Sequence, residues 1–324
     1  MAKTVKDESY IGRRIRLRDL HVFFTVTQRG SMAKAAADLR ITQPAVSRVI
    51  ADLEHALGVK LFDRSSQGVE ATMYGRALLR HGGVAFDEIR QAVREIEFLA
   101  NPNVGEVRIG CQESIAAAIL PPVLESLFRR YPAVMPIVDE VATPSLDFSE
   151  LRARRVDLII ARLGAPMMQR QTLDDLNVQV LFDDHAVVAA GTQSQWARRR
   201  RIDLADLADA PWILTEANSW NYAIIAEAFG ACGLKMPKIC LMTLSVHLRA
   251  NLLASGSFIT VLPRSVMSLY SRRFSLKVLP VNISTRPWPV AVVTLKSRTP
   301  SPVVELFIEH LRTFSRSLAG KLLS

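Results

Sequence analysis

The stretch from Gly30 to Gly58 constrains the fold of this 324-residue chain more than any other. It predicts two short helices joined by a tight turn at residues 40–41. Ser31 and Thr42 are residue types that cap helix N-termini, and Pro44 is tolerated in a first helical turn because its missing N–H has no partner there. Gly58 is a typical residue at the end of a helix.

The second of these helices has two unlike faces. Apolar residues recur at spacings of four, three and four, which gives one buried stripe: Val46, Ile50, Leu53 and Leu57. The opposite face carries Gln43, Ser47 and Arg48. In a helix-turn-helix, side chains at such positions meet base edges in the major groove of DNA. The alternative is an ordinary helical hairpin with a solvated polar face, and the flanking residues decide between the two.

A β-hairpin wing is predicted downstream. It consists of a strand at 59–64, a Gly-containing turn at 65–68 and a second strand at 69–72. Upstream, a further helix is expected to cover the apolar face of the helical pair, with Leu17, Leu20, Phe23, Phe24 and Val26. A winged helix-turn-helix fits all of these segments, whereas a bare helical hairpin explains only the middle one.

The run from Leu17 to Thr72 resembles the winged helix-turn-helix of the LysR-type transcriptional regulators. The residues that carry the likeness are Leu20, Phe23-Phe24, Gly30-Ser31, Ala35-Ala36, Leu39, Gln43-Pro44-Ala45-Val46-Ser47, Leu53-Glu54, Leu57-Gly58, Leu61-Phe62-Asp63-Arg64, Thr72 and Gly75. Two positions depart from it, since Met32 stands where the family often has Phe and Thr42 where it often has Ser. So many positions at fixed spacing make the likeness specific.

The resemblance implies a DNA-binding domain at 15–73, with the helix-turn-helix motif from Met32 to Ala51. The candidate DNA contacts are Ser31, Thr42, Gln43, Pro44, Ser47, Arg48 and Arg64.

A long helix is expected at 74–100, with Thr72 as its cap. Its apolar residues recur at spacings of seven, three, four and three, and they are Leu79, Phe86, Ile89, Val93 and Ile96. This seam either packs on its own domain or pairs two copies of the chain. We favour a linker helix that dimerises, and the resemblance implies the same, with a homodimer or homotetramer.

Residues 104–324 alternate between apolar strands and helices, which predicts an α/β domain of parallel sheets covered by helices. The length suits two lobes with a cleft between them. The resemblance implies a periplasmic-binding-protein-like (type 2) effector domain in which the chain crosses between the lobes twice. We expect crossings near 162–163 and 263–266, so that lobe one comprises 104–162 plus 267–324 and lobe two comprises 163–266.

Ligands of α/β lobes meet the carboxyl ends of strands and the N-termini of helices. That rule, with the family positions of Ser245 and Thr260, selects the candidate effector contacts Gln112, Ser114, Thr143, Asn218, Ser219, Ser245 and Thr260. Ser114 and Ser219 serve equally well as plain helix caps. Glu113 would repel an anion, which leaves a sugar or another hydroxyl-rich ligand open beside an organic acid.

The formal net charge of +10 suits a polyanionic partner such as DNA or a membrane surface. The four arginines from Arg198 to Arg201 are interpreted as part of a solvated loop rather than as a second DNA site.

The three cysteines form no CxxC pair or Cys/His cluster, so we expect no metal and no cofactor. No signal peptide and no run of about 18 apolar residues is present, which favours a cytoplasmic protein without a membrane partner.

An enzyme on an α/β scaffold is the competing interpretation. The sequence contains no GxSxG, GxGxxG, Walker or HExxH motif, and its six histidines are scattered. We therefore predict a bacterial transcriptional regulator and not an enzyme. Its expected partners are double-stranded promoter DNA, a small-molecule effector, RNA polymerase and further copies of itself.

Overall fold

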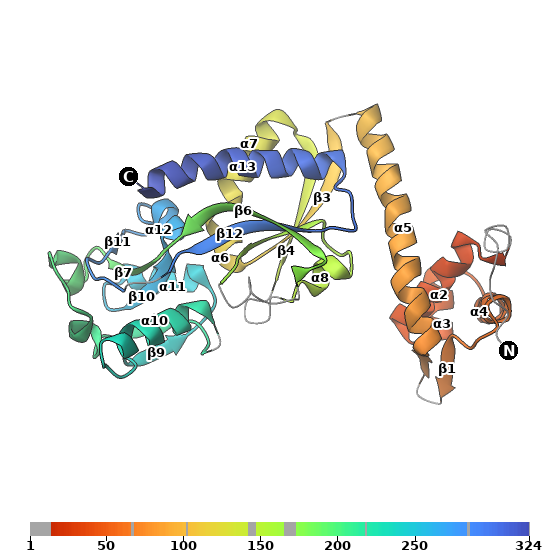
Figure 1. The fold of residues 1–324 in the computed structure, drawn as a ribbon, viewed down its shortest axis with the longest axis horizontal. Helices are drawn as coiled ribbons and strands as arrows, with labels where there is room; N and C mark the ends of the chain where they lie inside the picture. Colours follow the sequence, from red (N-terminus) through yellow and green to blue (C-terminus); the bar gives the residue numbers. More distant parts are fainter. Residues whose placement is uncertain are drawn as a thin grey trace. The chain divides into compact units, whose positions relative to one another are not determined.

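The structure is a computed structural model and describes residues 14–65, 68–101, 103–141, 147–164, 173–217, 219–283 and 286–323 (Figure 1). It divides into two compact units, Met1–Val93 and Arg94–Ser324. The border falls inside α5 (Met73–Ala100), which is continuous over its 28 residues. Among the described residues, no helix has the length and apolar character needed to cross a membrane.

The first unit contains the helix-turn-helix and its wing. Its elements before α5 are α2 (Leu17–Arg29), α3 (Met32–Leu39), α4 (Gln43–Leu57), β1 (Phe62–Ser65) and β2 (Gly68–Ala71). The two predicted caps are confirmed, because the hydroxyls of Ser31 and Thr42 accept hydrogen bonds from Lys34 N and Ala45 N at 3.4 and 3.3 Å. Between the helices, Arg40 adopts the left-handed conformation at φ 54°.

One apolar core holds these elements together. Val46 and Ile50 of α4 are fully buried against Phe23 and Val26 of α2, as the predicted stripe requires, whereas Leu57 is only partly buried. The rings of Phe23 and Phe62 lie 5.0 Å apart, so the start of the wing shares this core. Burial of this apolar area supplies the main favourable free energy of the unit.

The apolar seam of α5 serves two purposes. Leu79 packs on the helix-turn-helix core, and the ring of Phe86 lies 5.4 Å from that of Phe24. Ile89, Val93 and Ile96 instead remain 42%, 49% and 66% exposed. The predicted single stripe is therefore split between an intramolecular part and an exposed part.

The second unit contains two five-stranded sheets, each of which defines a lobe (Figure 1). The first lobe has the strand order β4 (Ala133–Glu140), β3 (Val104–Cys111), β5 (Leu158–Arg162), β12 (Trp288–Leu295) and β6 (Leu176–Asp184), with α6 (Glu113–Ala118), α7 (Leu120–Arg130), α8 (Ser149–Arg152) and α13 (Pro302–Leu323). The α13 helix packs on β3, β6 and α7, and together they enclose an apolar core.

The second lobe has a smaller sheet. Its strand order is β11 (Leu276–Val278), β7 (Ala186–Gly191), β10 (Ile259–Pro263), β8 (Trp212–Leu214) and β9 (Ile239–Met242), with α10 (Trp220–Ala231), α11 (Val246–Ala254), α12 (Arg264–Tyr270) and the 3-10 helices η2 (Gln195–Arg198) and η3 (Leu204–Leu207). Its core surrounds the buried rings of Trp212 and Phe229.

Two sequence-based expectations about the lobes are wrong. The chain crosses between Asp184 and Ala186 and again after Val278, not near 162–163 and 263–266. The charged residues Asp183 and Asp184 end β6 at the first crossing. The sheets are also mixed, because β12 runs antiparallel to β5 and β6, and β7 runs antiparallel to β10 and β11. Hydrophobic alternation does not report the direction of a strand that returns from the other lobe.

Prolines divide one helical segment of the first lobe. Residues 113–130 form two helices, α6 and α7, because Pro121 and Pro122 have no N–H to donate to the carbonyls of the preceding turn. The hydroxyl of Tyr270 donates to Ala117 O at 3.1 Å and so satisfies a carbonyl that Pro121 leaves without its helical donor. Pro136 is tolerated in β4 because β4 is an edge strand.

Two glycines of α5 provide a matched test of packing in the first unit. A Cβ at Gly75 would lie 2.2 Å from Leu61 O, whereas a Cβ at Gly83 would meet nothing within 4 Å. We expect Gly75→Ala to destabilise the helix-turn-helix unit by about 1–3 kcal/mol through overpacking. Gly83→Ala should be neutral or stabilising by up to about 1 kcal/mol, since Ala is the better helix former. Urea unfolding of the full chain would measure both, and equal midpoints for the two variants would contradict this packing.

Candidate DNA-binding surface and effector site

The outer face of α4 presents the polar residues selected from the sequence. Gln43, Pro44 and Arg48 are exposed and Ser47 is partly exposed, while Val46 on the inner face is fully buried. Thr42 is exposed at the N-cap, and the positive end of the α4 helix dipole lies beside these side chains. This combination suits a phosphate at the helix end and base edges along the helix.

Glu54 fixes the wing to this helix. Its buried carboxylate accepts hydrogen bonds from Lys60 Nζ at 2.7 Å, Leu61 N at 2.9 Å and Phe62 N at 3.4 Å. Burial raises the pKa of Glu54, but the hydrogen bonds from Lys60, Leu61 and Phe62 outweigh it and leave the pKa lowered. On the other strand, Val69 N donates to Gly30 O at 3.0 Å. The hairpin is thereby held against both ends of the helical pair.

A buried polar network joins the two lobes of the second unit. Arg162, at the end of β5, donates from Nε to Asp184 Oδ2 at 3.0 Å, from Nη1 to Ser114 Oγ at 2.7 Å and from Nη2 to Ser265 Oγ at 2.9 Å. Ser114 belongs to α6 of the first lobe, and Ser265 belongs to α12, which follows β10 of the second lobe. Asp184 lies where the chain crosses between them.

The acidic member of this network is also fully hydrogen-bonded. Asp184 has no exposed surface and accepts from His185 N at 3.0 Å and from Ser265 N at 3.1 Å, as well as from Arg162. Gln112 Oε1 accepts from Arg162 N at 3.1 Å. Desolvation of two charges is costly, so a buried ion pair needs such a complete set of partners.

Glu113 makes a second contact between the lobes. Its Oε1 accepts from Val246 N, the first amide of α11, at 2.9 Å. Burial raises the pKa of Glu113, and the Val246 N–H and the charge of Arg249 only partly offset this. Arg249 is itself 2% exposed, and burial lowers its pKa to about 10. Its Nη1 donates to Val261 O at 3.2 Å within the second lobe.

Two tryptophans meet at the same boundary. Trp220 begins α10 of the second lobe, Trp288 begins β12 of the first, and their ring centroids lie 5.0 Å apart. A Cβ at Gly164 would lie 2.5 Å from Trp288 Cη2, so only glycine lets the indole approach the chain after β5. Ser219 caps α10 by accepting from Tyr222 N at 3.4 Å.

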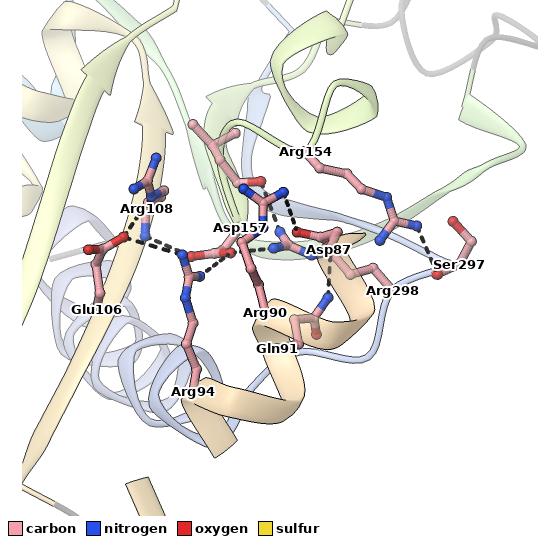
Figure 2. A network of polar contacts seen from close by, with 11 residues as sticks. Asp87, Arg90, Gln91, Arg94, Glu106, Arg108, Arg154, Asp157, Ser297 and Arg298 are labelled. Carbon is pink, nitrogen blue, oxygen red and sulfur yellow. Dashed lines mark hydrogen bonds and ion pairs between the residues drawn. The ribbon is translucent and has the colours of Figure 1, made fainter. Parts of the chain in front are cut away.

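At the other end of β5, the buried carboxylate of Asp157 ties three segments together (Figure 2). It accepts from Arg108 N of β3 at 2.8 Å, lies 2.8 Å from Arg298 Nη2 in the loop before α13, and lies 3.5 Å from Arg94 Nη1 in α5. Glu106 lies 3.3 Å from Arg94 Nη2 and 2.6 Å from Arg108 Nε. The last turns of α5 are therefore anchored on the sheet of the first lobe.

Two family models match these two regions. Residues 17–76 match the bacterial regulatory helix-turn-helix protein, lysR family, and residues 100–316 match the LysR substrate binding domain. This chain belongs to the LysR family. It is a LysR-type transcriptional regulator with a DNA-binding helix-turn-helix and an effector-binding domain, and its family consists of regulators rather than enzymes.

Curated relatives are similar over almost the whole chain. The HTH-type transcriptional regulator GbpR of Azospirillum brasilense is 28% identical over 311 residues, which cover 94% of this chain and 88% of GbpR. The HTH-type transcriptional regulator PcaQ of Agrobacterium fabrum is 25% identical over 304 residues, which cover 93% of this chain and 96% of PcaQ.

Solved structures of full-length LysR regulators share the fold. A full-length OxyR variant from Pseudomonas aeruginosa superimposes with a TM-score of 0.63 at 23% identity, covering 93% of this chain and 95% of that one. Full-length CbnR in complex with its target DNA gives a TM-score of 0.61 at 21% identity and covers 93% and 100%. The predicted fold class is confirmed by these likenesses.

The predicted effector contacts of this LysR chain fall into separate groups. Gln112 and Ser114 meet in the Arg162 network, while Ser219 and Ser245 cap α10 and α11 of the second lobe. Thr260 has no exposed surface, and its hydroxyl donates to Ile213 O inside the sheet. Thr143 and Asn218 lie outside the described residues, as does the side chain of Arg64, whose backbone belongs to β1.

Sequence reasoning missed four residues at the lobe boundary: Arg162, Asp184, Ser265 and Trp288. Arg162 and Asp184 did leave a signal, because each is a charged residue beside an apolar strand, and charges there are buried only when paired. Ser265 and Trp288 left none. In the part of the chain that the structure describes, no cluster of His, Cys, Asp or Glu could hold a metal ion.

Glu54 yields a test with a defined pH dependence. Because its pKa is lowered in the folded state, its contribution is present above the unfolded pKa of about 4.5 and is lost as the pH falls through the folded pKa. We expect Glu54→Gln to lower the stability of the helix-turn-helix unit by about 1–3 kcal/mol at pH 7, and by progressively less below pH 5. Thermal unfolding from pH 3 to 7 would measure this, with the exposed Glu70→Gln as control. A constant difference across that range would contradict the assignment.

Proposed function

We propose that this LysR regulator reads specific promoter sequences with the outer face of α4. The observation that carries the proposal is that Gln43, Ser47 and Arg48 are accessible on one face of a helix whose other face is fully buried. Amide, hydroxyl and guanidinium groups are those that discriminate base edges in the major groove. Ser31 and Thr42 are the N-caps of α3 and α4, and we propose that they and the wing residue Arg64 contact phosphates, which would position the DNA-binding unit on the duplex.

We also propose that the DNA-binding units of two copies of the chain act together. The row Ile89, Val93 and Ile96 of α5 is exposed at spacings of four and three, which is the pattern of a helix-pairing seam. A second copy of the chain is the natural occupant, because the row directly continues the helix that follows the DNA-binding unit. A homodimer, or a homotetramer built from two, would then read two-fold-related half-sites.

Control by a small molecule follows from the second unit. We propose that the effector binds between the lobes, beside Gln112, Ser114 and the N-termini of α10 and α11, and favours one lobe arrangement over another. A ligand can shift this equilibrium only by its difference in affinity for the two arrangements. The response would pass from Arg162 along β5 to Asp157 and from there to Arg94 of α5. It would change DNA bending or contact with RNA polymerase at promoters in the bacterial cytoplasm.

Base reading by α4 can be tested with alanine substitutions. We expect Gln43→Ala and Ser47→Ala each to weaken binding to the specific site by about 1–3 kcal/mol, roughly 5- to 150-fold, while non-specific binding stays within about twofold. Gel-shift titrations of the full chain on a selected site and on random DNA at one salt concentration would measure this. Gln28→Ala, on the exposed face of α2, is the matched control. Equal losses on both DNAs would exclude base reading by these residues.

The route through β5 can be tested without knowing the effector. Arg94→Met removes the two ion pairs that Arg94 makes with Glu106 and Asp157 but keeps the other partners of Asp157. We expect amide exchange at residues 94–101 to accelerate at least about tenfold, which corresponds to about 1.4 kcal/mol of lost local stability, while exchange in β7 and β10 stays unchanged. The exposed Arg129→Met in α7 is the control. Unchanged exchange at 94–101 would contradict the anchoring role of Arg94.

A further inference from the structure

The boundary between the lobes contains buried polar atoms with no hydrogen-bond partner among the described residues. Glu113 Oε2 is such an acceptor, and Trp220 Nε1 is such a donor. The neighbouring Asn221 is 6% exposed and has a buried Oδ1 without a partner. Buried polar groups are nearly always hydrogen-bonded, so several buried polar atoms without a partner at one boundary require an explanation.

Glu113 and Trp220 each contact the opposite lobe, Glu113 through Val246 N and Trp220 through the ring of Trp288. Glu113 precedes Ser114, which hydrogen-bonds Arg162. Two residues after Arg162, Gly164 packs on the indole of Trp288, and Trp288 contacts Trp220 of the other lobe. Leu163 N donates to Pro289 O at 2.9 Å, which fixes the start of β12 beside the end of β5. Glu113 and Trp220 thus present an acceptor and a donor from opposite lobes at the same boundary.

The charges at this boundary do not suit an acidic ligand. The guanidinium of Arg162 is directed at Asp184, Ser114 and Ser265. That of Arg249 donates from Nη1 to the Val261 carbonyl, its buried Nε has no hydrogen-bond partner among the described residues, and its charge is offset by that of Glu113. Glu113 adds a carboxyl group that accepts hydrogen bonds and repels other anions when it is ionised. A ligand that donates from neutral hydroxyls would satisfy Glu113 Oε2 at no such cost.

Two indole rings provide the aromatic surface of this boundary. Trp220 and Trp288 are each partly buried, and they meet at 5.0 Å with an interplanar angle of 58°, so neither ring face is covered by parallel stacking on the other. Flat apolar rings beside a few fixed polar groups are the usual lining of a site for a ring-shaped organic ligand. The C–H faces of a sugar ring pack on indole, while its hydroxyls both donate and accept.

We propose that the effector of this regulator is an uncharged, polyhydroxylated ring compound that donates a hydroxyl to Glu113 Oε2, accepts from Trp220 Nε1 and packs on Trp220 and Trp288. The proposal rests on the inter-lobe effector site proposed above and specifies its ligand class. An organic acid, which the sequence left open, is disfavoured by Glu113.

Matched sugar pairs test this proposal directly. Thermal unfolding of the full chain would be followed with D-glucose and D-glucuronate, with D-galactose and D-galacturonate, and with the neutral pentoses D-xylose and L-arabinose, all at equal concentration. A ligand that binds only the folded state raises the midpoint in a concentration-dependent way. We expect a neutral sugar to stabilise the protein and its uronate partner to give no shift.

Two variants identify the contacts. Trp220→Phe keeps an aromatic ring but removes the N–H, and Glu113→Leu removes the acceptor. Each should weaken binding of the stabilising sugar about tenfold, as expected for one lost hydrogen bond to a buried partner. Trp196→Phe and Glu125→Leu are the matched controls and should leave affinity unchanged. If Glu113→Leu does not fold, Trp220→Phe alone decides.

The outcomes separate this inference from the proposed function. No shift with any neutral sugar, a uronate that binds as well as its sugar, or full affinity in Trp220→Phe would each overturn the ligand class. Specific DNA binding by the wild-type chain is measured independently. Its loss would overturn the proposed function, whereas its presence without a sugar response would overturn only this inference.

Discussion

The buried ion pair between Arg162 and Asp184 is the interaction on which the effector domain depends. It lies where the chain crosses between the lobes, and the two serines that complete it come from α6 on one side and α12 on the other. Breaking one partner of a buried pair typically costs about 3–5 kcal/mol, because the remaining charge stays buried. A shift of one lobe relative to the other must therefore either carry this network intact or replace its hydrogen bonds. The effector that we propose beside Ser114 would act directly on this network.

The strand that carries Arg162 also carries the connection to α5. Every residue of β5 is buried, and the strand pairs with β3 on one side and with β12 on the other. Its five residues span roughly 17 Å at about 3.3 Å each, with Asp157 just before one end and Arg162 at the other. A close-packed central strand moves as a rigid element rather than bending. The geometry thus links the lobe boundary to Arg94 without any flexible segment between them.

The helix-turn-helix was predictable in detail because its determinants are local. Ser31, Thr42 and Gly58 act within one turn of their own position, and the stripe of Val46 and Ile50 follows directly from helical periodicity. The same logic located Gln112 and Ser114 at the carboxyl end of β3. In each case the residue type and its neighbours in sequence were sufficient.

The lobe boundaries and much of the proposed effector site depend on contacts between residues far apart in the sequence. Asp184 meets Ser265, 81 residues later, and Glu113 meets Val246, 133 residues later, so no short-range pattern reports these pairs. The crossings were misplaced for a related reason, because residues 181–190 are apolar apart from Asp183, Asp184 and His185 at the crossing itself. Trp288 gains its role from Gly164 and Trp220, neither of which is near it in sequence.

The central claim is that this LysR chain recognises defined two-fold-related DNA sites through the paired DNA-binding units of two copies. Selection of fragmented genomic DNA on the purified full-length protein at increasing salt, followed by sequencing, tests it most directly, because non-specific phosphate binding fades steeply with salt. The account predicts a small set of intergenic sites that survive higher salt and contain two related half-sites about one helical turn, or a multiple of it, apart. Featureless binding that disappears uniformly as the salt rises would contradict it.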